Sequence, residues 1–350
     1  MRPLFVPFFI PHLGCPHRCV FCDQEKVAGA RGVLPTEAEL VSRIEEYRAG
    51  APGRNLEVAF YGGTFTALPP ADQEALLAPL QPLLRRGVVA SVRLSTRPDA
   101  VDAGTALFLR ERGVATVELG VQSMDPEVLL FSGRGHGVVE VDLAVAALKE
   151  AGIEVGIQLM PGLPGDTPER SLATLRAALA LRPSFLRIYP TLVIDGTELA
   201  ERYRRGAYAP LALPDAVSLC KEMLITAARA GIPVIRMGLQ PTAELERPGT
   251  LLAGPYHPAF GQLVASEICF DVMCALLEGV PPGSEVSFGA PRGRVSDLVG
   301  QKRVNLARLA GHHGIQASVH EDAALDPELI SLKWQGGVRH ARRPDLHPQH

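Results

Sequence analysis

Near the N-terminus stands the stretch Gly14-Cys15-Pro16-His17-Arg18-Cys19-Val20-Phe21-Cys22, directly after an apolar run over Leu4–Ile10. Its three cysteines have the spacing Cys-x3-Cys-x2-Cys. Three thiolates so close in the chain can hold a cubane iron–sulfur cluster, but they leave one iron without a protein ligand. Clusters that only transfer electrons are normally held by four cysteines, and structural zinc sites also fill four positions. The spacing therefore predicts a cluster whose open iron accepts a chelating ligand.

A zinc site of the Cys3His type is the main alternative, with His12 or His17 as the fourth ligand. The other three cysteines, Cys220, Cys269 and Cys274, are scattered, which does not suggest a disulfide framework. We expect them to be buried structural thiols in a reducing compartment.

Apolar, β-branched segments alternate with helical patterns along the first part of the chain, which is typical of parallel βα units. Strands are predicted at Leu4–Ile10, Leu56–Tyr61, Ser91–Ser95, Thr116–Val121, Glu154–Met160 and Phe185–Tyr189. The predicted fold class is α/β, with a partial (β/α)6 TIM-like barrel over residues 1–212. A small α/β appendage is expected over 213–335, including helices at Phe260–Glu278 and Arg294–Leu309, and a disordered tail over 336–350.

Strand alternation predicts which side chains face the interior of this barrel. Glu118, Gly120 and Gln122 share one face of the fourth strand, and the same parity turns Arg93 inward from the third. Since a buried charge must be paired, we expect Arg93 and Glu118 to form an ion pair. A polar interior favours an open cavity that holds a polar ligand over a filled structural core.

Candidate ligand-binding residues follow the strands at their C-terminal ends, where barrel enzymes carry their sites. Glycines there let the backbone approach a ligand closely, and an arginine can grip a carboxylate with two hydrogen bonds. An Arg97–Asp99 pair and a solvated Arg134 are the structural alternatives. The candidates for cofactor binding are Phe21, Gly62, Gly63, Thr64, Ser95, Arg97, Gln122, Arg134, Met160 and Gly162.

The cysteine spacing, with Phe21 before the last cysteine, resembles the radical S-adenosylmethionine superfamily. That resemblance implies that Cys15, Cys19 and Cys22 hold a [4Fe-4S] cluster whose free iron binds S-adenosyl-L-methionine. It further implies reductive cleavage of that cofactor to a 5′-deoxyadenosyl radical, and an electron donor of the flavodoxin or ferredoxin type. Six further motifs look like the radical domain of the Elongator catalytic subunit, a family that modifies wobble uridine in tRNA: Tyr61–Pro69, Thr96–Asp99, Val117–Ser123, Arg134–His136, Met160–Gly165 and Ile188–Leu192.

Two departures from the Elongator pattern bear on the substrate: no acetyltransferase-like pyrophosphate loop follows Gln240, and no basic extension precedes the first strand. We therefore expect a metabolite-sized substrate. A tRNA substrate is the alternative, favoured if a basic stripe surrounds the barrel mouth, formed by Arg18, Lys26, Arg31, Arg202, Arg204 and Arg205. Further alternatives are an oxygen-independent coproporphyrinogen oxidase and a non-enzymatic iron–sulfur or zinc protein. Tyr256 and His257 are the candidate catalytic residues, as hydrogen-atom donor and acid.

Composition excludes extended disorder and a global basic field, but it does not exclude a local basic patch. Charged residues make up 21% of the chain, and 35 Lys and Arg against 38 Asp and Glu leave a net charge of −3. The first apolar run is too short to cross a bilayer or to form a signal peptide. The sequence predicts a cytoplasmic protein with no membrane partner.

Overall fold

A computed structural model describes residues 3–28 and 33–342 of the chain. The chain divides into two compact units: Met1–Leu211 with Leu239–Pro255, and Ala212–Gly238 with Tyr256–His350. The predicted boundary after residue 212 lies beside this division, but the segment Leu239–Pro255 returns to the first unit. Arg31 and residues 343–350 lie outside the described residues.

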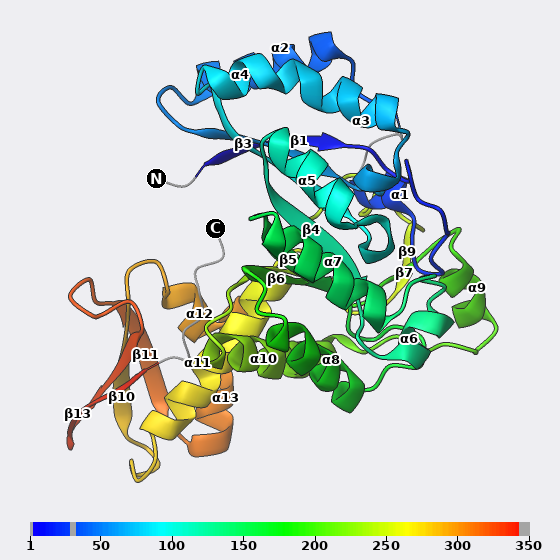
Figure 1. Ribbon diagram of the computed structural model, residues 1–350. Coiled ribbons are helices and arrows are strands. Elements are labelled where there is room, and N and C mark those ends of the chain that lie inside the picture. The colour runs from blue at the N-terminus through cyan, green and yellow to red at the C-terminus, as the bar shows by residue number, and fades with distance from the viewer. Residues whose placement is uncertain (1–2, 29–32, 343–350) are drawn as a thin grey trace. The chain divides into compact units, whose positions relative to one another are not determined.

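The first unit alternates strands and helices (Figure 1). Its strands are β1 (Leu4–Phe9), β2 (Leu56–Tyr61), β3 (Val89–Thr96), β4 (Val114–Gln122), β5 (Glu154–Leu159), β6 (Phe185–Ile188), β7 (Val193–Ile194) and β9 (Leu251–Ala253). Its helices are α1 (Gln24–Ala28), α2 (Glu37–Gly50), α3 (Pro70–Leu77), α4 (Gln81–Arg85), α5 (Ala103–Glu111), α6 (Pro126–Phe131), α7 (Val138–Glu150), α8 (Pro168–Ala180) and α9 (Glu198–Arg204).

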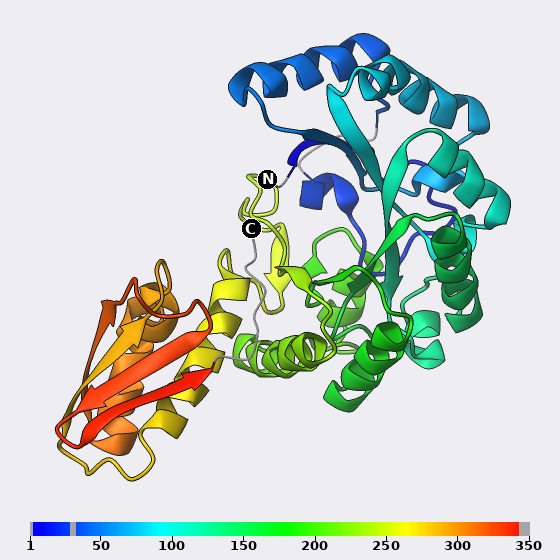
Figure 2. The same ribbon diagram turned by 60° about the vertical axis from the view of Figure 1, so that its left-hand side comes forward.

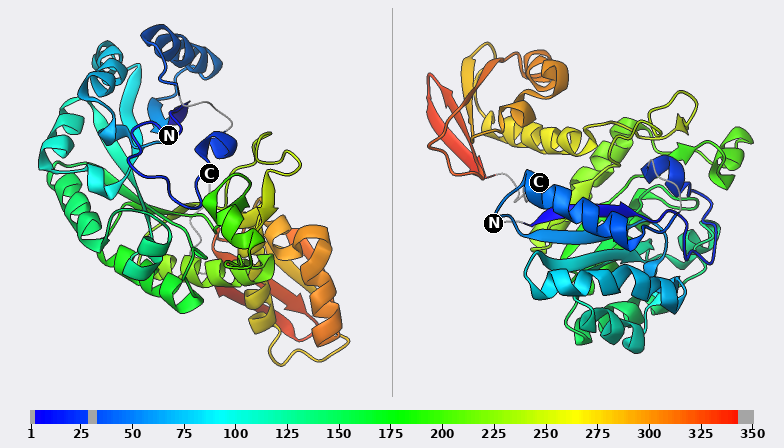
Figure 3. Two further views of the ribbon diagram at one scale, coloured as in Figure 1. Left: turned by 90° about the vertical axis from the view of Figure 1, so that its right-hand side faces the viewer. Right: turned by 90° about the horizontal axis from the view of Figure 1, so that it is seen from above.

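Strands β1 to β6 pair side by side in chain order, and every pairing among them is parallel. The sheet curves, and the helices line its convex outer side (Figure 3, left). The predicted partial barrel is confirmed; the prediction for β2 has the observed bounds, and the other five differ from them by at most two residues at an end. Connections through helices are what parallel neighbours require, because a tight turn cannot link them.

The alternation of β4 separates the two faces of the sheet as predicted. Val117, Leu119 and Val121 are fully buried. They lie on the face of the strand that the outer helices cover. Glu118 and Gln122 have the opposite parity and are also buried, at 5% and 6% exposed. These two polar side chains of the inner face are therefore removed from water, so they need partners within the protein.

The second unit contains a four-stranded sheet in the order β11-β10-β12-β13, seen with its helices behind it in Figure 2. Strands β10 and β11 are parallel, whereas β12 is antiparallel to both β10 and β13. The strands of this sheet are β10 (Glu285–Ala290), β11 (Gln316–Glu321), β12 (Leu329–Trp334) and β13 (Gly337–Arg342), and β8 (Val234–Met237) lies in the same unit but outside this sheet. Its helices are α10 (Leu213–Arg229), α11 (Phe260–Leu276), α12 (Val295–Val299) and α13 (Val304–His313).

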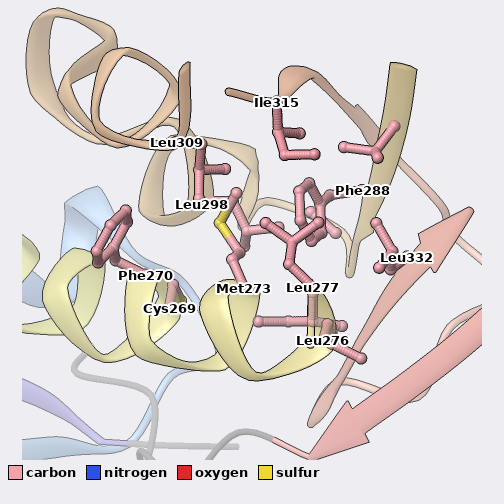
Figure 4. Close-up of a cluster of buried hydrophobic side chains, with 13 residues drawn as sticks. Cys269, Phe270, Met273, Leu276, Leu277, Phe288, Leu298, Leu309, Ile315 and Leu332 are labelled. Carbon is pink, nitrogen blue, oxygen red and sulfur yellow. The ribbon is translucent and has the colours of Figure 1, made fainter. Parts of the chain in front are cut away.

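A hydrophobic core joins this sheet to its helices (Figure 4). Met273 of α11, Leu298 of α12 and Leu309 of α13 meet Phe288 and Leu332 of the sheet, and all five are fully buried. The appendage thus has a core of its own, which a small domain needs in order to be stable.

Two predictions for this region are wrong. The helix expected over Arg294–Leu309 is two helices, because the chain leaves helical geometry at Gly300 and re-enters it at Val304. The tail expected to be disordered from residue 336 instead forms β13, which pairs with β12 over Gly337–Arg342. This segment is polar, so its sequence lacks the apolar pattern of a buried strand. Backbone hydrogen bonds to β12 order it nonetheless.

The prediction of buried thiols holds for two of three cysteines. Cys220 and Cys269 are fully buried, but Cys274 is only half-buried, with its Sγ 3.6 Å from Nε2 of His313. Within the described ranges, no helix combines the length and the apolar character needed to cross a membrane.

Candidate functional site

The cysteine loop connects β1 to α1 at the C-terminal end of the first strand. Cys19 is buried, and Cys15 and Cys22 are half-buried. Burial, together with negative charge on Cys19 and Cys15, raises the pKa of Cys22 to about 12, so the three sulfurs lie close enough to interact electrostatically. Burial also raises the pKa of Cys15. The thiolates that a metal centre needs would therefore form here only with a cationic partner to stabilise them.

Gln24 fastens the cysteine loop to the turn after β2. Its Oε1 accepts hydrogen bonds from the backbone N–H of His12 (2.5 Å) and of Gly63 (2.7 Å). The backbone N–H of Gln24 donates a hydrogen bond to Nε2 of His12 (2.9 Å). This ring nitrogen of His12 is therefore engaged at the start of α1.

Two glycines allow the loop and the turn to pack backbone against backbone. Gly63 has φ +61°, and a Cβ there would lie 2.4 Å from the carbonyl oxygen of Leu13. At Gly14, with φ +71°, a Cβ would lie 2.3 Å from the carbonyl oxygen of Thr64. This contact brings Cys15 Sγ within 3.3 Å of Thr64 Oγ1. Gly62, by contrast, would place such a Cβ in ordinary van der Waals contact, 3.5 Å from the backbone of Pro11 and 3.6 Å from Oε1 of Gln24.

Arg134 is buried, at 5% exposed, so the alternative of a solvated loop residue is wrong. Its Nη1 donates to Sγ of Cys19 (3.0 Å), and its Nη2 donates to the carbonyl oxygen of Gly120. Its Nε is buried and has no hydrogen-bond partner in the part of the chain that the structure describes. An orphaned donor on a buried cation is costly unless a ligand completes it.

Arg97 also approaches Cys19, with 3.8 Å between Nη1 and Sγ. The rest of its guanidinium is engaged: Nε and Nη2 each donate to the carboxylate of Asp99 at 2.9 Å. The structural alternative of an Arg97–Asp99 pair is thus what the structure has, and only one edge of Arg97 faces the cysteine. Burial, together with the charges of Arg134 and Arg97, lowers the pKa of the neighbouring His136 to about 4.

Gln122 ends β4 in a left-handed conformation, with φ +70°. Its Oε1 accepts from Nε2 of Gln158 (3.0 Å). Non-glycine residues seldom adopt this conformation, and they do so mostly at functional sites and turns. Ser95 lies one strand away on β3, half-buried, and its backbone is in register with Glu118.

Phe21 and Met160 meet in an apolar cluster beside the cysteines. Phe21 is buried with Cys19, Val20, Val128, Leu163 and Leu199, and Met160, Cys22 and Tyr208 pack against this group. Gly162 stands at φ +84°, and its carbonyl oxygen accepts from the Tyr208 hydroxyl at 2.6 Å. The cluster fixes the cysteine loop against the turn after β5, so Phe21 has a structural role whatever else it touches.

The predicted ion pair inside the sheet is confirmed and is part of a larger network. Arg93 donates to Glu118 and to Glu57, both at 3.0 Å, and Arg187 Nε lies 2.8 Å from Glu118. Arg187 also contacts the hydroxyl of Tyr61. Glu57 and Tyr61 were missed in the sequence, although the alternation of β2 turns both inward.

The remaining predicted residues have other partners or lie in the second unit. Tyr256 and His257 belong to the second unit, and Nδ1 of His257 accepts from the backbone N–H of Ala259 (3.0 Å). The ring of His17 packs against Gly135. Among residues 3–28 and 33–342, no three His, Cys, Asp or Glu side chains converge as ligands of one metal ion. A cubane cluster differs from a single ion in taking each thiolate on a separate iron atom.

Comparisons with known proteins agree with this architecture. The family model of the Radical SAM superfamily matches residues 9–178, and that of the Radical SAM C-terminal domain matches residues 183–269. A tRNA uridine(34) acetyltransferase from Dehalococcoides mccartyi is 28% identical over 57% of this chain and 50% of its own length. The heme chaperone HemW of Escherichia coli is 29% identical over 61% of this chain and 56% of its own length.

Among solved structures, an archaeal Elp3 from Methanocaldococcus infernus superposes with a TM-score of 0.59 at 24% identity, over 75% of this chain and 62% of that one. At this identity the likeness shows the fold alone. The chain spans about half the length of the tRNA uridine(34) acetyltransferases that it matches. The two family models match consecutive parts of the chain, residues 9–178 and 183–269. The chain therefore belongs to the radical S-adenosylmethionine superfamily of enzymes, and its cofactors are a [4Fe-4S] cluster and S-adenosyl-L-methionine.

Proposed function

We propose that Cys15, Cys19 and Cys22 hold the cluster and that the residues around them bind S-adenosyl-L-methionine. The observation that carries this proposal is the arrangement around Cys19, which receives hydrogen bonds from two buried guanidinium groups. When bound, the pair of cofactors supplies reductive cleavage of S-adenosyl-L-methionine and a 5′-deoxyadenosyl radical. The two arginines stabilise negative charge on the sulfur, and the apolar cluster of Phe21 excludes water.

The residues at the strand ends fit the polar parts of the nucleotide cofactor. The orphaned Nε of Arg134 suits a carboxylate. Gly62 and Gly63 both have positive φ, and glycines let the backbone of the Gly62-Gly63-Thr64 turn approach a ligand closely. Gln122 and Ser95 offer donors and acceptors to ribose hydroxyls, and Met160 and Gly162 suit the edge of the adenine ring. We infer that these residues and Arg97 form the cofactor-binding set.

Anaerobic reconstitution with iron, sulfide and dithionite tests the ligand assignment. Cys15→Ala, Cys19→Ala and Cys22→Ala should each abolish the visible absorption of the cluster and the formation of 5′-deoxyadenosine from S-adenosyl-L-methionine. Cys274→Ala is the matched control, because that cysteine is half-buried in the second unit and should leave both signals unchanged. Iron bound normally by any of the three loop variants would contradict the assignment.

For the substrate we propose a uridine nucleotide of an RNA in place of the metabolite expected from the sequence. The support is that several curated relatives are named tRNA uridine(34) acetyltransferases. The basic stripe that would favour tRNA does not add support, since three of its members are paired with acids: Lys26 with Asp23, Arg202 with Glu198, and Arg204 with Asp195. Consumption of S-adenosyl-L-methionine that rises with added tRNA, and not with a metabolite extract, is the expected result; the reverse would overturn this substrate class.

We further propose a reducing protein of the flavodoxin or ferredoxin type as the electron donor, because the cluster must be reduced before the cofactor is cleaved. Tyr256 and His257 remain the proposed catalytic pair. Tyr256→Phe should leave cluster absorption unchanged and lower product formation, which separates a role in substrate chemistry from one in folding.

A further inference from the structure

A basic turn in the second unit has no part in the chemistry described so far. It comprises Gly300-Gln301-Lys302-Arg303 and links α12 to α13. Lys302 (φ +51°) and Arg303 (φ +62°) are consecutive non-glycine residues in the left-handed region. Such residues are uncommon even singly, and the conformation persists only where the surrounding structure holds it.

The structure does hold this turn firmly. Gly300 is buried with φ +72°, and a Cβ there would lie 2.8 Å from Val304 and 3.1 Å from Asn305. Asn305 is 1% exposed. Its Nδ2 donates to the carbonyl oxygen of Leu298 (3.1 Å) and to Oγ of Ser266 (2.9 Å), which ties the start of α13 to α12 and α11.

The side chains of the turn are free to meet a partner. Lys302 and Arg303 are exposed, and neither forms an ion pair or a hydrogen bond with any side chain in the described part of the protein. By contrast, nearby Arg294 and Arg308 are paired with Asp297 and Glu267. Two adjacent uncompensated cations on a rigid turn are complementary to a polyanion.

The two helices that the turn joins both pack against a strand at the edge of the sheet. Strand β11 is the outermost strand of its sheet, and both α12 and α13 contact it. Gln316, Ser318 and His320 of this strand are exposed. An edge strand offers unpaired backbone donors and acceptors, although the side chains of Ser318 and His320 are already bonded to Val286 and Ser287 of β10. Figure 1 labels α12, α13 and β11, the three elements that frame this surface.

We propose that the turn Gly300–Arg303 and the edge strand β11 form a binding surface for single-stranded RNA. Lys302 and Arg303 contact the phosphates, and the polar edge of β11 contacts bases. The turn resembles the GXXG loop of KH modules, which clamps the backbone of a short single strand. Here Arg303 stands at the second glycine position and keeps the left-handed conformation that a glycine would adopt. The choice of RNA rests on the proposed function; the binding surface itself does not.

Fluorescence polarisation of the full-length protein with a labelled single-stranded oligoribonucleotide, at two or more salt concentrations, tests this surface. The variant Lys302→Gly/Arg303→Gly removes both charges and is compatible with the left-handed backbone, so it should fold at least as well as the native chain. We expect its affinity to fall about tenfold or more. The slope of log K against log salt should decrease by about 1.4, because each phosphate of a single strand that a cation neutralises contributes about 0.7.

The matched control is Arg229→Gly/Lys333→Gly, which removes the same charge from two exposed residues of the same unit on α10 and β12. This control should bind the oligonucleotide like the native protein. Native affinity in the Lys302→Gly/Arg303→Gly variant, or an equal loss in the control, would overturn the proposal. Tighter binding of duplex RNA, or of DNA of the same sequence, would overturn the assignment to single-stranded RNA.

Cofactor cleavage in the same preparations separates this proposal from the proposed function. The Lys302→Gly/Arg303→Gly variant should form 5′-deoxyadenosine normally in the absence of RNA and should lose only its stimulation by RNA. RNA binding without any cofactor cleavage would contradict the proposed function and leave the binding surface standing.

Discussion

At the scale of single residues, the charges inside the sheet of the first unit are compensated with little exposure to water. Arg93 lies between Glu57 and Glu118, and their side chains are 9%, 6% and 6% exposed. Burial raises the pKa of Glu57, although Arg93 opposes this shift. Buried ion pairs are sensitive to the loss of one partner because the remaining charge is left in a poorly solvated place.

We therefore expect Arg93→Met to lower the free energy of unfolding by about 3–5 kcal/mol, measured by urea denaturation. Lys221→Met removes the cation of a more exposed pair with Asp271 and should cost at most about 1 kcal/mol. Equal losses in the two variants would show that the network contributes no more than a surface pair does.

His136 predicts a pH dependence of stability. Its folded-state pKa of about 4 lies below the ordinary value of 6.5, because burial and two arginines disfavour its charged form. Between these values the unfolded chain binds a proton that the folded chain does not, so stability falls as pH decreases from about 6.5 to 4. The loss attributable to His136 is up to about 3 kcal/mol.

Urea unfolding of the cluster-free protein at several pH values measures this effect, and His136→Gln is the comparison. The variant should lose less stability than the native chain over the same interval. Parallel pH profiles would mean that His136 titrates alike in the folded and unfolded states.

At the scale of elements, the cysteine loop depends on the turn after β2. Gly63→Ala places a Cβ 2.4 Å from the carbonyl oxygen of Leu13 and 2.5 Å from that of Ile10, so the loop must move. We expect this variant to incorporate markedly less iron on reconstitution. Gly62→Ala has a similar positive φ but meets nothing closer than 3.5 Å, and it should cost about 1 kcal/mol while iron content stays native. Iron content that is native in both would show that the packing of loop on turn does not position the cysteines.

Helices and strands could be predicted where a periodic pattern of apolar residues coincided with local signals, such as a helix cap or a run of β-branched residues. The strands of the first unit have such patterns, and α2 begins with a capping box between Thr36 and Glu39. The break between α12 and α13 was missed because Lys302 and Arg303 are good helix formers, and packing of Asn305 overrides their local preference. Strands β11 and β13 were missed because their exposed faces carry little apolar signal.

At the scale of the whole molecule, each unit has its own packed interior. Leu309 is fully buried in the core of the second unit, where it packs with Leu298 and Phe288. Leu309→Ala should destabilise that core by about 2–5 kcal/mol. Amide hydrogen exchange followed by mass spectrometry should then show faster exchange in peptides from 285–342.

Peptides from the cysteine loop and from β2 should keep their native exchange rates in the Leu309→Ala protein, since the two units are separate by their internal contacts. Faster exchange that extends into residues 4–28 would mean that the units unfold together.

The sequence alone determined the class of the fold, the position of the cysteines after the first strand and the inward parity of Arg93 and Glu118. These features depend on short-range periodicity and on the spacing of residues, both of which can be read directly from one sequence. The sequence could not show whether Arg134 is exposed to solvent. Nor could it show whether the Arg97 side chain pairs with Asp99 or binds a ligand.

Only the tertiary structure decided these points, because Cys19 is 78 positions from Arg97 and 115 from Arg134 along the chain. Contacts over such distances depend on how strands and turns pack, and no local pattern encodes them. The same reason applies to the turn at Lys302 and Arg303, whose left-handed backbone is held by Gly300 and Asn305 and not by its own residues.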